Sequence, residues 1–171
     1  ISQWDEASMM PVGGGAGRGR ALSTLGGVIH GMVTEPQLKD MIARAEGEAP
    51  DPWQQANLRE IQRVVTEATA LPATLVESMS LAASRCEQAW RTCRAANDWD
   101  SLVPLLTEVV RLAREKAKIL GAAGDCTPYD ALLDLFEPGF TMAMIDPIFA
   151  DLKAFLPPFV EQVLERQSGE V

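Results

Sequence analysis

Residues 71–120 read LPATLVESMSLAASRCEQAWRTCRAANDWDSLVPLLTEVVRLAREKAKIL, and this stretch decides the fold class. Its first half places apolar side chains at helical spacing and predicts a helix that ends near Ala96. Its second half repeats that spacing and predicts another long helix, which ends near Gly121 or Gly124. The Asn-Asp-Trp-Asp stretch at 97–100 is a tight connection with residues that cap helices. We therefore expect two long helices that lie side by side as an antiparallel hairpin.

Helical spacing continues before and after this hairpin. Upstream, one apolar stripe consists of Leu22, Leu25, Val28, Ile29 and Met32. Further helix starts are indicated by a capping-box pattern at Thr34–Gln37, by Asp51-Pro52 and by Thr127-Pro128. No segment alternates as a half-buried strand would. The sequence thus predicts an all-α protein, a bundle of about six helices with short loops.

The two ends of the chain depart from this pattern. Residues 1–20 include the run Gly13-Gly14-Gly15-Ala16-Gly17-Arg18-Gly19-Arg20. We therefore expect a single helical domain of residues 1–171, in which residues 1–20 are an extended, flexible entry segment and residues 21–171 are helical. The run lacks the spacing of a phosphate-binding loop, and no predicted strand precedes it. Near the other end, Pro157-Pro158 lies inside a helical pattern. An interior proline costs roughly 3 kcal/mol, so we expect a kink or a break there.

The composition excludes two classes of partner. The chain has 171 residues, of which 47% are hydrophobic, and this is enough for a real core. Its net charge of −9 argues against nucleic acid, because phosphate binding needs clustered lysine and arginine. No apolar run reaches the length of a membrane span, so we expect no membrane partner.

The three cysteines indicate a reducing environment. Cys86 and Cys93 are seven residues apart on one predicted helix, which places their Cα atoms about 10 Å apart. That distance is too long for a disulfide. With Cys126 they make an odd set, and we expect reduced, mostly buried thiols in a cytoplasmic protein.

No catalytic or metal-ligating residue can be assigned from the residue types and their spacing. A catalytic zinc site needs about three protein ligands and an open position, whereas this chain has a single histidine, His30. We expect that histidine to be packed or hydrogen-bonded beside the apolar stripe. Four carboxylates are spread over a loop and a short predicted helix, namely Asp125, Asp130, Asp134 and Glu137. They match no calcium-loop spacing, and we expect structural or surface roles for them.

Four motifs nevertheless resemble those of one family. They are Trp4-Asp5 followed by Met10-Pro11, Asp51-Pro52-Trp53-Gln54, Glu87-Gln88-Ala89-Trp90, and Pro128-Tyr129-Asp130-Ala131-Leu132-Leu133-Asp134. Their order and spacing are similar to those of the carboxypeptidase Taq family of thermostable metallocarboxypeptidases, over nearly the whole chain. The resemblance implies the N-terminal part of a larger helical metallopeptidase fold.

That resemblance also implies a function. Members of the family remove C-terminal residues from peptides, with a metal, zinc or cobalt, held by a His-Glu-x-x-His helix and a further glutamate. No position of this sequence matches those ligands, so we expect a fragment of a longer enzyme that has no cofactor of its own and is inactive alone. It would supply scaffold and one wall of the groove for the peptide substrate. Trp4, Asp5 and Met10 are the candidate groove-lining residues.

The alternative is a stand-alone helical interaction module without catalysis. A fragment, in contrast, should expose apolar surface that evolved to pack on the rest of the enzyme. The expected places are the first segment, around Trp4, Met9 and Met10, and the last, around Phe155, Phe159 and Val163. Because burial of apolar area is favourable, we expect self-association or a homodimer.

Overall fold

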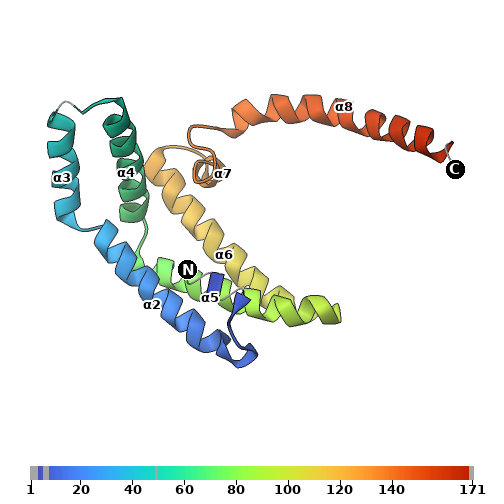
Figure 1. Cartoon of the computed structure of the whole chain (residues 1–171), viewed down its shortest axis with the longest axis horizontal. Helices are drawn as coiled ribbons and strands as arrows, with labels where there is room; N and C mark the ends of the chain where they lie inside the picture. The colour runs from blue at the N-terminus through green and yellow to red at the C-terminus, as the bar shows by residue number, and fades with distance from the viewer. Residues whose placement is uncertain (1–3, 6–7, 49, 170–171) are drawn as a thin grey trace.

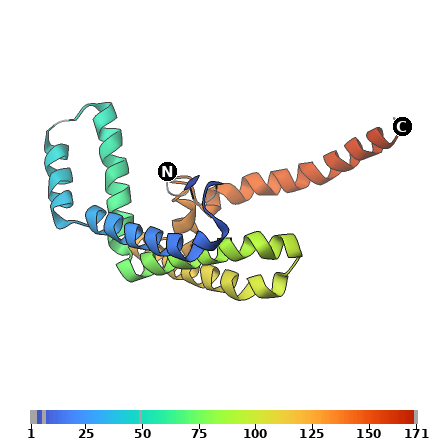
Figure 2. The same ribbon diagram turned by 60° about the horizontal axis from the view of Figure 1, so that its bottom comes forward.

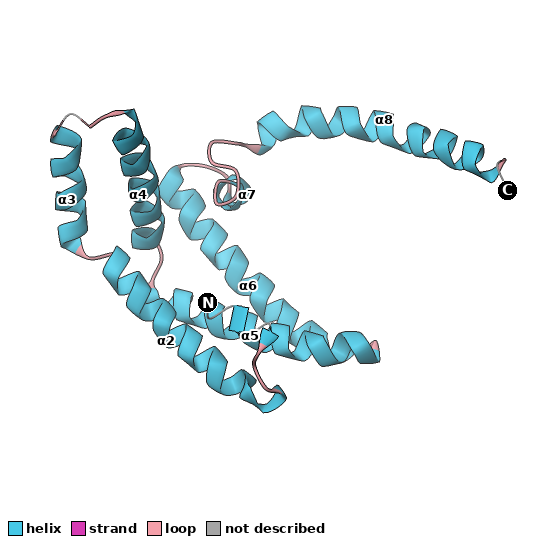
Figure 3. Cartoon of the chain, viewed as in Figure 1, coloured by secondary structure: helices cyan, strands magenta, loops and turns pink. Residues whose placement is uncertain are grey.

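A computed structural model gives the arrangement of the chain and describes residues 4–5, 8–48 and 50–169, apart from the side chain of Val12 (Figure 1). In chain order the elements are η1 (Val12–Gly14), α2 (Gly15–Val33), α3 (Pro36–Gly47), α4 (Pro52–Ala70), α5 (Ala73–Ala96), α6 (Trp99–Gly124), α7 (Pro128–Leu133) and α8 (Met142–Ser168). Every one of these elements is a helix, and the described residues contain no strand (Figure 3). The prediction of an all-α fold is confirmed.

Helices α5 and α6 form the predicted antiparallel hairpin and lie side by side (Figure 2). The chain reverses at Asn97, whose φ of 54° is a left-handed conformation that asparagine adopts more readily than most residues. Helix α6 starts directly afterwards, because the Asp98 carboxylate accepts a hydrogen bond from the amide of Ser101 at 3.1 Å. The main hydrophobic core lies along this hairpin and consists of Leu71, Leu75, Leu112, Leu120 and Ala131.

Helix α2 packs along α5 through small residues that recur every four positions. The row consists of Gly15, Gly19, Ser23 and Gly27. A Cβ atom added at Gly19 would lie 3.0 Å from Ser84 Oγ. Ser23 Oγ donates a hydrogen bond to the carbonyl of Glu77 at 3.2 Å. Larger side chains on this row would force the two helices apart, so the small residues set their distance.

The expectation of an extended segment over residues 1–20 is therefore wrong for residues 12–20. Helix α2 begins at Gly15, directly after the turn η1. A glycine inside a helix costs roughly 1 kcal/mol relative to alanine, which is why the run predicts a flexible chain when it is considered alone. Contact with α5 requires the absence of a side chain at Gly19, and this packing outweighs the local preference.

Helices α3 and α4 form a second, shorter hairpin that extends from the end of α2 (Figures 1 and 2). Helix α4 starts as predicted with a capping box, since Asp51 and Gln54 each accept a hydrogen bond from the other's amide at 2.9 Å. The capping box expected at Thr34 does not form. Thr34 Oγ1 instead donates to the carbonyl of His30 at 2.8 Å and so closes the end of α2.

Helix α8 extends away from the other helices, and none of its described residues is buried (Figure 1). A break at Pro157-Pro158 does not occur, because α8 continues through both prolines as one helix. None of the other described helices packs along α8, and the helix accommodates the proline rings with a gentle curvature (Figure 1). The bundle thus consists of α2 to α7, and α8 projects from it.

Candidate functional site

A groove of about 580 Å³ lies between the N-terminal segment, the first turns of α2 and the middle of α5. Its apolar lining consists of Met10, Pro11, Ala16 and Leu81. Its polar lining consists of Arg20, Ser84, Arg85, Gln88, Arg91 and Thr92. The close packing of Gly19 on Ser84 joins the two helices that form its sides. We name this cavity the α2–α5 groove.

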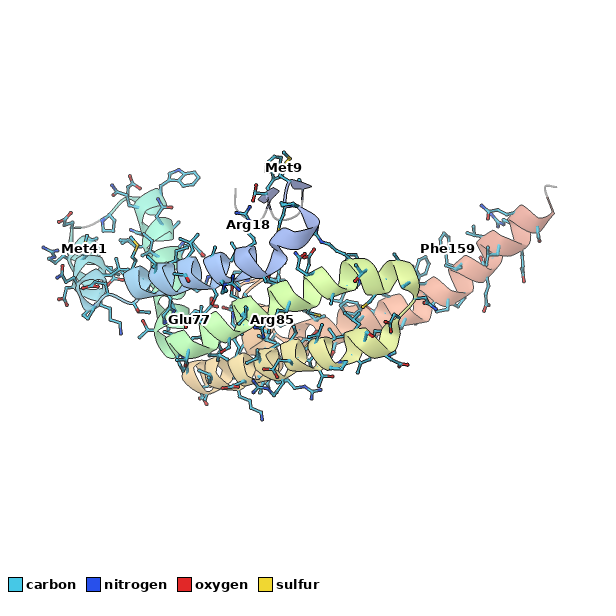
Figure 4. The ribbon with its side chains drawn as sticks, turned by 90° about the horizontal axis from the view of Figure 1, so that it is seen from below. Met9, Arg18, Met41, Glu77, Arg85 and Phe159 are labelled. Atoms are coloured by element: carbon cyan, nitrogen blue, oxygen red, sulfur yellow. The ribbon has the colours of Figure 1, made fainter. Side chains whose placement is uncertain are left out.

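The three candidate groove-lining residues do not share one role. Met10 lines the α2–α5 groove and is half-buried. The carbonyl of Asp5 accepts hydrogen bonds from the amides of Met9 and Met10, at 2.9 and 3.0 Å, and its carboxylate pairs with Arg18 of α2. Asp5 therefore fastens the turn that carries Met10 (Figure 4 labels Met9 and Arg18). Trp4 has 62% of its surface exposed and does not line the groove.

A second groove, of about 550 Å³, lies between α4, α6 and α7. Arg59 and Arg63 of α4 face it on one side, and Asp130 and Asp134 on the other. Both carboxylates accept hydrogen bonds from backbone amides, which agrees with the structural or surface roles expected from the sequence. Asp130 accepts the amide of Met142 at 2.7 Å, and Asp134 accepts the amide of Gly139 at 2.8 Å.

The electrostatics of Asp130 follow from these bonds. The hydrogen bond from the Met142 amide, and then that from the Thr127 hydroxyl, hold the pKa of the Asp130 carboxyl below its ordinary value. This carboxyl is therefore ionised at neutral pH and accepts hydrogen bonds from both sides. Asp130 therefore accepts the hydrogen bond that holds the first residue of α8, and it does not act as a proton donor.

The described residues do not fit a catalytic metal. They contain no group of three or more histidine, cysteine, aspartate and glutamate side chains that could hold one. His30 is half-buried on α2, and its carbonyl accepts the Thr34 bonds that close that helix. Cys86 and Cys93 are free and half-buried, and Cys126 is free and exposed. Cys86 and Cys93 are therefore more accessible than the prediction of mostly buried thiols requires.

No described helix is both long enough and apolar enough to cross a membrane.

The arginines of the α2–α5 groove were not singled out from the sequence, because Arg20 falls in the glycine run and Arg85 in an ordinary helical pattern. The recurrence of small residues every four positions from Gly15 could have placed α2 against α5. That recurrence would have brought these arginines together.

Comparison with known proteins decides the family. The sequence matches carboxypeptidase Taq (M32) metallopeptidase over residues 1–170. The chain belongs to this family. It is similar to thermostable carboxypeptidase 1 of Thermus thermophilus, with 33% identity over 96% of this chain and 34% of that protein. It is also similar to thermostable carboxypeptidase 1 of Pyrococcus furiosus, with 29% identity over 95% of this chain and 32% of that protein.

Solved structures share the fold. Metallocarboxypeptidase 1 of Trypanosoma cruzi has a TM-score of 0.81 and 34% identity over 98% of this chain and 34% of its own. The crystal structure of BsuCP has a TM-score of 0.86 and 25% identity over 95% of this chain and 33% of its own. Our chain therefore spans about a third of the length of the relatives it matches. Because the alignment with the Trypanosoma cruzi structure covers 98% of this chain, it must include the 27 residues of α8. The similarity therefore extends to this projecting helix.

Proposed function

We propose that this chain is the N-terminal helical region of a metal-dependent carboxypeptidase that removes C-terminal residues from peptides. In this proposal it supplies scaffold and one wall of the substrate groove, and the catalytic site lies in other parts of the enzyme. The observation that carries the proposal is the family match over residues 1–170, together with relatives that are named carboxypeptidases and of which this chain spans a third.

The surface area supports a role within a larger enzyme. The chain exposes 12455 Å². A compact monomer of 18.5 kDa would expose about 8,200 Å². The excess has a visible source, since α8 buries none of its described residues and carries exposed apolar side chains along its length. We infer that the remainder of the enzyme covers α8.

The exposed apolar surface occurs at both expected places. Trp4 and Met9 are exposed in the first segment, and Phe155 and Phe159 in the last (Figure 4 shows Met9 and Phe159). The rings of Phe155 and Phe159 stack at 5.3 Å between centroids and leave about half of each side chain in solvent. Patches larger than a few hundred Å² are uncommon on soluble monomers. We therefore propose that the chain by itself associates with a second copy.

We infer that the catalytic metal of this proposal is bound outside the described residues. In a metallocarboxypeptidase a bound Zn²⁺ or Co²⁺ would polarise the scissile carbonyl and activate water. No donor set for such an ion exists among the described residues, so no step of the reaction is assigned to this chain. Its own contribution is to position groove walls on rigid helices, held by the α2–α5 packing and by the Asp5–Arg18 ion pair.

A chimera tests this function directly. The matching third of the Thermus thermophilus relative is replaced by this chain, and release of the C-terminal residue from an N-terminally blocked peptide is measured. We expect the chimera to retain activity, and the Arg18→Ala chimera to fold but to have a raised KM, because the turn that carries Met10 loses its ion pair. A folded chimera that has lost all activity would count against the proposal.

A further inference from the structure

The α2–α5 groove combines arginine side chains with an apolar lining, and this combination is chemically specific. We propose that the groove binds an acidic peptide segment, with Arg20 and Arg85 pairing with its carboxylates and with Met10 and Leu81 in contact with its apolar side chains. This site requires neither a metal nor catalysis. Its occupant is a segment of another polypeptide that contains glutamate or aspartate beside large apolar residues.

The first observation is the charge of the groove. The chain as a whole carries a net charge of −9, yet among the described residues the charged side chains that line this groove are Arg20, Arg85 and Arg91, all of them positive. Arg91 forms an ion pair with Glu87 at 2.7 Å. Neither Arg20 nor Arg85 has an ion pair or a hydrogen bond with any described residue. Two positive charges beside one groove thus remain without a carboxylate in the described part of the chain.

The second observation concerns the chemistry of those charges. Guanidinium groups form two parallel hydrogen bonds with a carboxylate, and such pairs are stronger than bonds between neutral groups. Arg20 comes from α2 and Arg85 from α5, so their side chains approach the groove from two different helices (Figure 4 labels Arg85). A ligand with two carboxylates could bind both arginines at once.

The third observation separates a peptide from a free inorganic anion. Four apolar residues line the same groove, namely Met10, Pro11, Ala16 and Leu81. Its volume of about 580 Å³ falls within the roughly 300–1,000 Å³ of sites for drug-sized ligands, which is far more than one small anion fills. A small anion would leave the apolar lining in water. An acidic segment with leucine or similar side chains would use both parts of the groove.

The test measures binding of a defined probe to the whole chain. The probe is the peptide acetyl-Leu-Glu-Leu-Glu-Leu-amide with an uncharged fluorophore, and its blocked ends prevent cleavage or recognition as a carboxypeptidase substrate. We expect saturable binding in fluorescence anisotropy that weakens as salt is added. The double variant Arg20→Gln/Arg85→Gln should bind at least about tenfold more weakly, because two charge-assisted contacts are lost.

The matched control is the double variant Arg44→Gln/Arg114→Gln. It removes two exposed arginines of α3 and α6, neither of which lines the groove, and changes the net charge equally. This control should keep the affinity of the unmodified chain. All four arginines are exposed, so both variants should keep the circular dichroism and the unfolding midpoint of the unmodified chain.

Several results would overturn the proposal. The first is the absence of saturable probe binding by the unmodified chain, and the second is equal affinity in Arg20→Gln/Arg85→Gln. A peptide with glutamine in place of glutamate that binds equally well would exclude the carboxylate pairing.

Two further results would assign the groove to another occupant. Pyrophosphate that binds as tightly as the peptide would show a general anion site. A dimer in sedimentation that Arg20→Gln/Arg85→Gln abolishes would show that a second copy fills the groove. Failure of the chimera to act as a carboxypeptidase would leave this binding unaffected.

Discussion

The Asp130 Oδ1 atom accepts a hydrogen bond of 2.7 Å from the amide of Met142, the first residue of α8. The same carboxylate accepts the Thr127 hydroxyl through Oδ2, also at 2.7 Å. Asp130 lies on α7, which packs on the end of α6, so this one side chain connects the core to the start of the projecting helix. The start of α8 is therefore held by a carboxylate that the sequence presents only as one acidic residue among several.

The first prediction follows from the lowered pKa of Asp130. The Met142 amide and then the Thr127 hydroxyl favour the charged form, so its contribution to stability is present above the ordinary aspartate pKa, near 4, and is lost as the pH falls through the lower pKa of the folded protein. In NMR spectra the amide proton of Met142 should shift with a midpoint below the ordinary value. The Asp130→Ala variant should lose this transition, whereas Asp151→Ala should keep it. A midpoint at or above the ordinary value would contradict the hydrogen bond.

The second prediction concerns the small-residue contact between α2 and α5. Gly19→Leu should lower the free energy of unfolding by about 2–3 kcal/mol, because a side chain at this position would collide with Ser84. Gly17→Leu is the matched control, since a Cβ atom at Gly17 meets nothing within 4 Å and leucine is the better helix former. Urea unfolding measures both. Equal stabilities of the two variants would show that the helices do not pack as closely as described.

The helix boundaries show which parts of the fold the sequence could predict and which it could not. The α5–α6 hairpin was predictable because its apolar spacing and its Asn97-Asp98 turn are local signals. The start of α2 was not, because Gly15 and Gly19 disfavour a helix locally and are tolerated only through contact with α5, more than 60 residues away in sequence. The capping box expected at Thr34 differs for a local reason, since a threonine between two helices can close the first, as it does here through the His30 carbonyl, instead of starting the second.

The groove residues show a different limit. The resemblance singles out Trp4, Asp5 and Met10 for the wall of the substrate groove, and this stays a prediction. Of the three, Met10 lines the α2–α5 groove, and Asp5 holds the turn that carries Met10. Arg20 and Arg85 come together only because α2 and α5 lie side by side. Proximity between distant segments depends on tertiary packing, and the residue spacing of either segment alone does not contain it.

The third prediction concerns the thiols. Cys126 is exposed after the end of α6, whereas Cys86 and Cys93 are half-buried on α5. A disulfide-exchange reagent should therefore modify Cys126 first and the other two more slowly, and denaturant should remove the difference. Mass spectrometry of the partly labelled chain identifies the order. Labelling of Cys86 and Cys93 at the rate of Cys126 would contradict the described burial.

The fourth prediction concerns association through α8. Sedimentation of the isolated chain should show a concentration-dependent dimer, and Phe155→Ser/Phe159→Ser should raise its dissociation constant at least tenfold. Full burial of each phenylalanine side chain in the dimer would stabilise it by about 1.5–3 kcal/mol. Gln162→Ser, an exposed polar change on the same helix, is the control and should have no effect. A monomer at every concentration would favour a stand-alone module whose exposed surface serves another partner.

The most direct measurement is a combined metal and activity assay of the purified chain. The chain is incubated with Zn²⁺ or Co²⁺ and desalted, its metal content is determined, and release of the C-terminal residue from an N-terminally blocked peptide is followed. Because the described residues offer no donor set, we predict substoichiometric metal and no release above the rate without protein. One equivalent of bound metal together with trimming of the peptide would show that the chain contains a complete catalytic site, and would contradict its role as scaffold and groove wall.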